Sequence, residues 1–169
     1  AAIVERVRSY AIGTRSERVS SEVSELVNKA VREFKRQSGE RVEVWVPQEQ
    51  PVYIIVNPLE FELVIINLLR NAAQALQELG VLNPKVALTI KREDNKALIA
   101  IEDNGHIEKE KIEKLSEPTN STKADGLGLG LQIVRSIIEN HGGKIFFSQA
   151  ASGGLRVEIR LPAEETTEQ

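Results

Sequence analysis

Cysteine and methionine are both absent from this chain of 169 residues. Without cysteine, the chain can form no disulfide and offers no thiolate to a metal ion. This composition suits a reducing compartment. The chain lacks methionine and begins with Ala1-Ala2, so we expect the sequence to be a segment of a longer protein.

A basic surface and long apolar runs are lacking as well. The formal net charge of -3 argues against nonspecific binding to nucleic acid, which needs a basic surface. No apolar run is long enough to span a membrane and no signal peptide is visible, so we expect this segment to be cytoplasmic. The hydrophobic content of 41% is ordinary for a soluble globular domain with one core.

Hydrophobic periodicity predicts a chain in which helices and strands are interspersed. The first predicted helix begins at a cap formed by Ser20 or Ser21 and ends near Gln37. Three more helices are predicted, over 58–79, over 108–115, and from the glycine stretch to residue 139. Alternating apolar residues predict strands over 42–46, 52–56, 85–91, 97–101, 145–147 and 155–161. We expect residues 1–19 to be a linker preceded by the end of a helical hairpin or coiled coil, or by a frayed amphipathic terminus. Residues 20–162 are expected to form one domain, and 163–169 a frayed acidic tail.

A glycine-rich stretch leads into the last helix. Residues 125–133 read Asp-Gly-Leu-Gly-Leu-Gly-Leu-Gln-Ile. Glycine permits close backbone approach, and a helix N-terminus presents free N–H groups to an anion. The stretch is therefore typical of a phosphate cradle. A flexible loop with a helix cap explains the same residues equally well.

The long helix over 58–79 is apolar over a wide arc, yet it carries polar residues along one side. Glu60, Asn67, Asn71 and Gln74 recur there at helical spacing. Buried amides are costly unless they are hydrogen-bonded. Either these side chains face a cavity that holds a ligand, or the amides bond to neighbouring backbone.

Asp103 lies at the end of a predicted strand, on the same face as Ile99 and Ile101 and just before Gly105. A half-buried carboxylate there needs a hydrogen-bond donor. A ligand or the turn backbone of Asp-Asn-Gly can supply one. The polar stretch over 105–127 that follows is long for a loop inside a compact domain, which indicates a lid or a disordered segment.

Four of these features occur in a set order along the chain: Asn67-Leu-Leu-Arg-Asn71-Ala, then Asp103-Asn-Gly105, then the long loop, then Gly126-Leu-Gly128-Leu-Gly130-Leu131. Over about residues 20–162, the chain resembles the catalytic ATP-binding domain of sensor histidine kinases, in the GHKL ATPase superfamily. The resemblance implies the Bergerat fold, a two-layer α/β sandwich. Its mixed sheet would have about five strands, with three helices on one face.

The resemblance implies ATP and Mg²⁺ as cofactors. Asn71 would coordinate Mg²⁺ through a hard amide oxygen, and Asn67 would support that site from one turn earlier. Asp103 would accept a hydrogen bond from the adenine amino group, with Gly105 beside the base. The groups implied to hold the phosphates are Lys123 and the cradle formed by Gly126, Leu127, Gly128, Leu129, Gly130 and Leu131.

The implied reaction transfers the γ-phosphoryl group of ATP to a histidine on a dimerisation helix outside this chain. The implied partners are the dimerisation helices of the same protein and a response regulator. The full-length protein would be a homodimer, whether or not it is anchored to a membrane. Neither histidine of this chain fits the acceptor. His141 is expected to cap a helix end or to be solvated, and His106 follows the Asp-Asn-Gly turn.

Hydrolytic relatives place a glutamate where this chain has Asn67. Because an amide is no base, Asn67 favours phosphotransfer over hydrolysis, with Glu60 as a weaker rival base.

Two departures from the family pattern stand out. Asp103-Asn-Gly105-His106-Ile107 lacks the second glycine of the first glycine box and is one residue short. Leu115-Ser-Glu-Pro-Thr-Asn120 has lost the phenylalanines that are common there. These departures predict a loose lid, with weaker nucleotide affinity or impaired phosphotransfer. The alternative function is a degenerate nucleotide-binding or docking module with little or no kinase activity.

Overall fold

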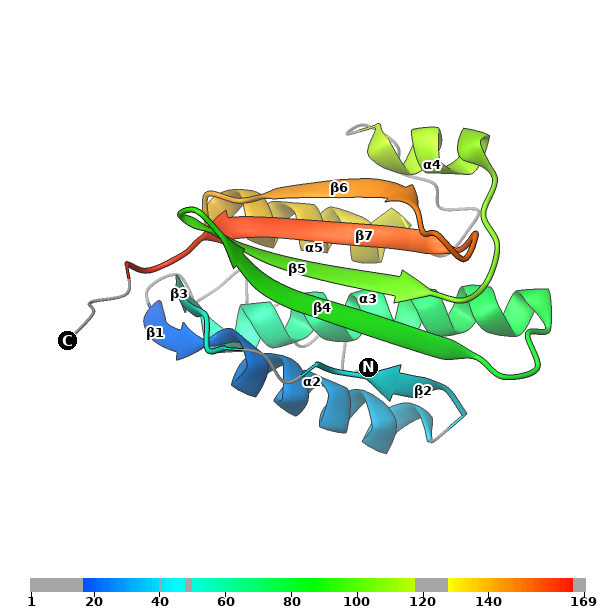
Figure 1. The fold of residues 1–169 in the computed structure, drawn as a ribbon, viewed down its shortest axis with the longest axis horizontal. Helices are drawn as coiled ribbons and strands as arrows, with labels where there is room; N and C mark the ends of the chain where they lie inside the picture. The colour runs from blue at the N-terminus through cyan, green and yellow to red at the C-terminus, as the bar shows by residue number, and fades with distance from the viewer. Residues whose placement is uncertain (1–16, 40, 48–49, 118–127, 166–169) are drawn as a thin grey trace.

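The structure is a computed structural model that describes residues 17–39, 41–47, 50–117 and 128–165 (Figure 1). In chain order its elements are β1 (Val19–Glu22), α2 (Val23–Ser38), β2 (Glu43–Trp45), β3 (Tyr53–Val56), α3 (Pro58–Leu79), β4 (Lys85–Glu93), β5 (Lys96–Asp103), α4 (Lys109–Ser116), α5 (Gly128–Asn140), β6 (Lys144–Gln149) and β7 (Leu155–Pro162). Among the described residues, no helix is both apolar enough and long enough to cross a lipid bilayer.

The main sheet has five strands in the order β2-β4-β5-β7-β6. β2 runs parallel to β4, and the other neighbours are antiparallel. The predicted mixed sheet of about five strands is therefore confirmed. The strand predicted over 52–56 lies outside it, because β3 pairs with β1 in a separate two-stranded antiparallel sheet.

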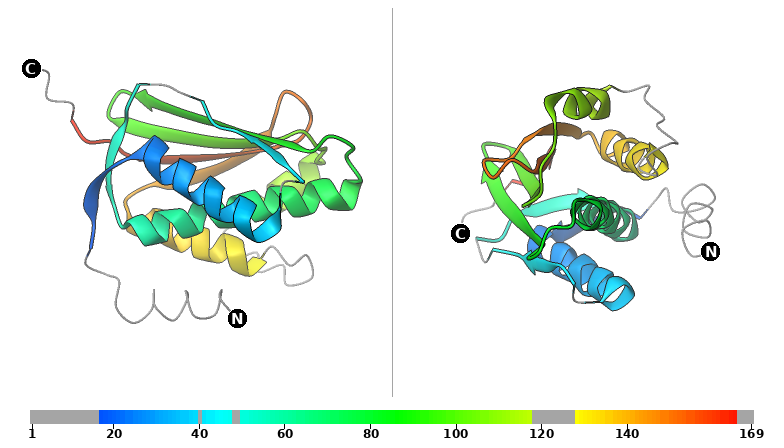
Figure 2. Two further views of the ribbon diagram at one scale, coloured as in Figure 1. Left: turned by 90° about the horizontal axis from the view of Figure 1, so that it is seen from below. Right: turned by 90° about the vertical axis from the view of Figure 1, so that its right-hand side faces the viewer.

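Helices α2, α3 and α5 form one layer against the main sheet (Figure 2). α3 lies in the middle of this layer and contacts α2, α5 and β5. Its apolar side chains form the centre of the core, with Phe61, Ile65 and Leu69 fully buried. The predicted two-layer α/β sandwich is confirmed. The short α4 is a fourth helix and lies beside β6 (Figure 1).

Both ends of α3 follow from local sequence. The Asn57 side-chain oxygen accepts the N–H groups of Leu59 and Glu60 at 3.0 and 3.1 Å. Pro58 follows at the first helical position, where its missing N–H costs nothing. Gly80 ends the helix in the left-handed conformation, with a φ of 67°. These signals fix the bounds of the helix that carries Asn67 and Asn71.

The start of α2 differs from the prediction. Ser20 and Ser21 belong to β1, where they pair with Ile55 and Ile54, and neither caps the helix. Glu22 is the N-cap instead, and its carboxylate accepts the N–H of Glu25 at 2.8 Å. A strand of four residues shows too little alternation to be recognised in sequence, so its serines resembled a helix cap.

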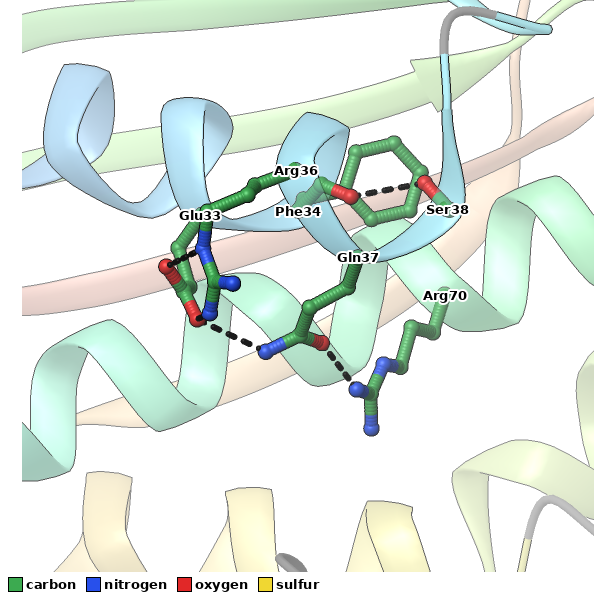
Figure 3. Close-up of polar contacts among 6 residues, drawn as sticks. All are labelled: Glu33, Phe34, Arg36, Gln37, Ser38 and Arg70. Atoms are coloured by element: carbon green, nitrogen blue, oxygen red, sulfur yellow. Dashed lines mark hydrogen bonds and ion pairs between the residues drawn. The ribbon is translucent and has the colours of Figure 1, made fainter.

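Side chains also link α2 to α3 near the end of α2 (Figure 3). Arg36 and Gln37 both donate to Glu33, at 2.6 and 2.9 Å. Arg70 of α3 donates to the side-chain oxygen of Gln37. Arg36 and Gln37 are exposed, and Glu33 and Arg70 are half-buried, so this network near the surface contributes little stability. It does restrain the outer edges of the two helices relative to each other.

The C-terminal segment remains attached to the fold beyond β7. The sequence predicts a frayed tail from residue 163, but Ala163 and Glu164 donate backbone N–H groups to Asn95 and Tyr53 at 2.9 and 2.8 Å. The guanidinium of Arg92 donates to the carbonyl of Glu164. Residues 166–169 lie outside the described residues.

His141, directly after α5, is buried, with 7% of its surface exposed. Of the two predicted environments, the cap on a helix end is observed and the solvated ring is not. Its Nδ1 lies 2.7 Å from the carbonyl oxygen of Ile137, and its Nε2 accepts the N–H of Asn57 at 3.2 Å. These partners require the neutral ring with its hydrogen on Nδ1. Burial lowers the pKa of His141 below its usual 6.5, and the hydrogen bond to Ile137 opposes that shift.

Acidification is therefore expected to destabilise the fold through His141. Because its pKa is lower in the folded state, the unfolded chain takes up a proton first as the pH falls below about 6.5. We expect the free energy of unfolding, from urea denaturation, to fall as the pH is lowered from about 7.5 to about 5.5.

His141→Gln removes the titrating ring and should flatten this dependence. His106→Gln is the matched control, because His106 is exposed. A pH dependence that persists in His141→Gln and disappears in His106→Gln would contradict the assignment.

Candidate functional site

A cavity of about 380 Å³ lies between α3, the end of β5, α4 and the strands β6 and β7. Apolar side chains form most of its wall, including Leu68, Ala72, Ile107, Leu131 and Phe147. The polar residues that line it are Asn71, Glu78, Asp103, His106, Glu108 and Lys111. Apolar walls with a few convergent polar groups are typical of a site for a small organic ligand.

Asp103 accepts hydrogen bonds from backbone N–H groups and also borders the cavity. Its Oδ1 accepts the N–H of Gly105 at 2.9 Å and that of Leu155 at 3.4 Å, while the residue also lines the cavity. The side chain is buried, with 6% exposed. Burial raises the pKa of Asp103 above its usual 3.8, and the two N–H groups act against that rise. One oxygen thus holds the turn while the carboxylate borders the cavity.

Gly105 lets the β5–α4 loop lie against α3. A Cβ at this position would be 3.1 Å from Asp103 Oδ1 and from methyl carbons of Leu76 and Leu79. That spacing is tighter than ordinary van der Waals contact. Glycine is therefore favoured here by space, which keeps the loop close to the cavity wall.

The polar residues of α3 do not share one environment. Only Asn71 of the four lines the cavity. Gln74 is exposed and donates to Glu78 at 3.2 Å, while Glu60 and Asn67 are buried outside the cavity wall. Of the two interpretations of this polar stripe, the cavity holds for Asn71 alone, and bonding to backbone holds for Asn67. The cavity lies over the sector of Leu68, Ala72 and Ala75, which is displaced around the helix from the polar stripe.

Asn67 lies between α3 and α5. Its Nδ2 donates to the carbonyl of Leu63 at 2.9 Å, as the backbone-bonding interpretation of the amides predicts. A Cβ at Gly130 would be 3.4 Å from Asn67 Oδ1. Gly130, in the first turn of α5, therefore lies close to the turn of α3 that precedes Asn71.

The glycine stretch is described only in part. α5 begins at Gly128, so Gly128, Leu129 and Gly130 form its first turn. Leu131 follows and lines the cavity. The positive end of the α5 dipole therefore lies near the cavity wall. The predicted phosphate-binding residues Lys123, Gly126 and Leu127 lie outside the described residues.

The far wall of the cavity was not predicted from the sequence. Phe147 of β6 and Leu155 and Val157 of β7 line it. Arg135 of α5 lies over the Phe147 ring, at 5.3 Å from its centroid, and donates to the carbonyl of Leu115 at the end of α4. The alternation of β7 identified a core-facing side, but it could not show that two of these residues border a cavity.

The part of the chain that the structure describes contains no cluster of carboxylates or imidazoles that could form a metal site. Among the described residues, no three or more Asp, Glu or His lie close enough together to hold a metal ion. The amide of Asn71 remains as a hard oxygen donor in the cavity wall. Such a sparse protein ligand set suits Mg²⁺, which keeps several waters and takes further oxygens from phosphates.

The sequence profile of the histidine kinase-, DNA gyrase B-, and HSP90-like ATPases matches residues 56–165. The chain belongs to this family. It is 31% identical over 169 residues to the sensor protein TdiS of Thauera aromatica, and the aligned region covers 95% of this chain and 30% of TdiS. It is 34% identical over 125 residues to sporulation kinase B of Bacillus subtilis, covering 73% of this chain and 28% of the kinase. The chain therefore spans about a third of the length of these relatives.

Solved structures agree with this assignment. The fold matches the nucleotide-free catalytic domain of histidine kinase ThkA with a TM-score of 0.72 and 26% identity, over 86% of this chain and 95% of that one. The mycobacterial sensor histidine kinase MprB matches with a TM-score of 0.70 and 22% identity, over 89% and 100% of the two chains, which shows the shared fold. The predicted resemblance to histidine kinase ATP-binding domains is confirmed.

Proposed function

We propose that this chain is the catalytic ATP-binding domain of a two-component sensor histidine kinase, which transfers the γ-phosphoryl group of ATP to a histidine on a dimerisation helix. The observation that carries the proposal is that Asp103 and Asn71, from two different elements, line one mainly apolar cavity. The family of the chain and its sensor kinase relatives support ATP as the ligand.

The described residues fit an adenine nucleotide. Apolar side chains such as Ile107, Leu131 and Phe147 offer contact to a flat base. Asp103 offers an acceptor to the amino group of adenine. The start of α5 offers N–H groups to phosphates, and Gly126, Leu127 and Lys123 before it would add to that site.

Asn71 is the residue that would hold Mg²⁺, through its side-chain oxygen. When bound, Mg²⁺ supplies positive charge to the phosphate oxygens of the nucleotide. Asn67, which contacts α3 backbone and the start of α5, would keep Asn71 and the phosphate-binding turn in register. The work of these residues is to position groups and stabilise charge, which is what phosphoryl transfer requires.

Phosphotransfer is favoured over hydrolysis because Asn67, which is not a base, stands where hydrolytic relatives have a glutamate. Its amide cannot accept a proton from water, and its Nδ2 is bonded to Leu63. Glu60, the rival base, is buried and lies outside the cavity wall. His141 is buried with both ring nitrogens engaged, and His106 is paired with Glu108 at 3.0 Å, so neither suits the acceptor role. We infer that the acceptor lies on another helix.

The partners that follow are ATP and ADP, the dimerisation helices of the same protein in a homodimer, and a response regulator. Nucleic acid is not expected, in view of the negative net charge of -3. This domain would work in the cytoplasm, whether or not the whole protein is anchored to a membrane.

Calorimetric titration tests nucleotide binding directly. We expect ADP and a non-hydrolysable ATP analogue to bind with micromolar affinity and more tightly with Mg²⁺ than without it. GDP is the control ligand and should bind weakly. Absence of binding at millimolar ADP would contradict the proposal and would favour the docking module, which keeps the fold without its chemistry.

A further inference from the structure

We propose that the hairpin between β6 and β7, through Gly154, positions the Asp103 carboxylate and thereby sets the preference of the cavity for adenine over guanine. The inference rests on the proposed function, because it assumes that the cavity takes a purine nucleotide. It assigns Gly154 as a positioning residue, which acts on the ligand through Asp103.

Gly154 lies directly against Asp103. A Cβ at Gly154 would be 2.2 Å from the Asp103 carbonyl oxygen and 2.3 Å from its Oδ1, which is far closer than real side chains approach. The φ of Gly154 is not positive, whereas that of the neighbouring Gly153 is 102°. Space alone therefore requires glycine at position 154.

The hairpin also bonds to Asp103 on both sides of this contact. Leu155 donates its N–H to Asp103 Oδ1 at 3.4 Å, and the Ser152 hydroxyl donates to the Asp103 carbonyl at 3.3 Å. The hairpin is closed by the N–H of Ala150, which donates to the Gly154 carbonyl at 2.7 Å. Asp103 is thus held by a turn that is itself hydrogen-bonded.

The same hairpin holds the loop that leaves Asp103. Ile107 donates its N–H to the Gly153 carbonyl at 3.0 Å, and the Gln149 amide donates to the Ile107 carbonyl at 3.1 Å. This loop is the shortened glycine box. The hairpin therefore fixes both the carboxylate and the segment that follows it, along one wall of the cavity.

This arrangement determines which carboxylate oxygen a ligand meets. Both hydrogen bonds that the described residues donate to the carboxylate end on Oδ1, which leaves Oδ2 as the acceptor for a base. Adenine presents an N–H donor at its C6 amino group, whereas guanine presents a carbonyl oxygen at the same place. A rotated or displaced carboxylate would lose the bond to adenine and relax the rejection of guanine.

The test compares Gly154→Ala with Gly153→Ala. A Cβ at Gly153 would lie 3.6 Å from His106 Nδ1 and 3.9 Å from the Gly105 carbonyl, so this variant strains the same turn without touching Asp103. We expect Gly154→Ala to weaken ADP binding about tenfold and to reduce the ratio of ADP to GDP affinity by a similar factor. Gly153→Ala should lower Tm and leave that ratio within about twofold.

Three further results decide the inference. An unchanged ratio in a folded Gly154→Ala overturns it. If Gly154→Ala does not fold, Ser152→Ala is the milder probe. In that case, a ratio of ADP to GDP affinity in Ser152→Ala that equals the wild-type ratio overturns the inference. Added to Asp103→Asn, Gly154→Ala should cost no further affinity, because it acts through Asp103.

The failure of this inference is distinguishable from that of the proposed function. Wild-type protein that binds neither nucleotide, or binds both equally, contradicts the proposed function and this inference with it. Wild-type protein that prefers ADP, with the same preference in Gly154→Ala, contradicts only the positioning role of Gly154.

Discussion

Asp103→Asn is expected to weaken ADP binding by about a hundredfold, measured by calorimetry with Mg²⁺ present. The Asn side chain keeps an oxygen that can accept the N–H groups of Gly105 and Leu155, so the turn is preserved. Its amide nitrogen takes the place of the second carboxylate oxygen. It then points a donor at the amino group of adenine, and two donors repel.

The same substitution should change the ligand preference and not simply abolish binding. An amide donor can bond to the C6 carbonyl of guanine, so the ratio of GDP to ADP affinity should rise. Asp94→Asn is the matched control, because Asp94 lies in the β4–β5 turn with a φ of 55°, a conformation that Asn tolerates well. If Asp103 served only its turn, both variants would bind ADP as the wild type does.

The bounds of α3 could be predicted closely because both ends carry strong local signals. Asn57-Pro58 begins the helix and Gly80 ends it, and each acts through residues next to it in sequence. The start of α2 could not be predicted in the same way. It depends on the pairing of Val19 with Val56, a contact between distant residues that leaves no local pattern.

The candidate site shows a similar division. Asn71 and Asp103 both line one cavity, and the roles in binding Mg²⁺ and adenine that the resemblance implies for them stay predictions. Glu60 and Asn67 share a helix side with Asn71, but helical period does not reveal which sector of a helix the sheet leaves uncovered. Gly154 lies against Asp103, and nothing in the sequence around the β6–β7 hairpin indicated that contact.

His141 was predicted only in part. Its position after α5 indicated either a cap on the helix end or a solvated ring, and its Nδ1 does lie 2.7 Å from the carbonyl oxygen of Ile137 in the last turn. The burial of α3 and α5 against one sheet instead brings His141 to the backbone of Asn57, far away in sequence. Such a contact between helix ends depends on the packed tertiary structure, so the sequence alone could not show that the ring is buried.

Asn71→Ala is expected to remove the Mg²⁺ dependence of nucleotide binding. Asn71 is the only amide side chain among the described residues that line the cavity, and amide oxygen is a ligand that Mg²⁺ accepts. We expect Mg²⁺ to strengthen ADP binding to the wild type about tenfold and to have almost no effect on the variant. Phosphotransfer to the dimerisation helices should fall further than binding, because charge on the phosphates is greatest in the transition state.

Adenosine separates a metal role of Asn71 from a role in cavity shape. It lacks phosphates, so its affinity should be the same for the wild type and Asn71→Ala. Gln74→Ala is the matched control on the same helix, because Gln74 is exposed and bonded to Glu78. If Asn71→Ala weakened adenosine as much as it weakened ADP with Mg²⁺, the side chain would support the base pocket. In that case a cation at the phosphates would have to be held by groups outside α3.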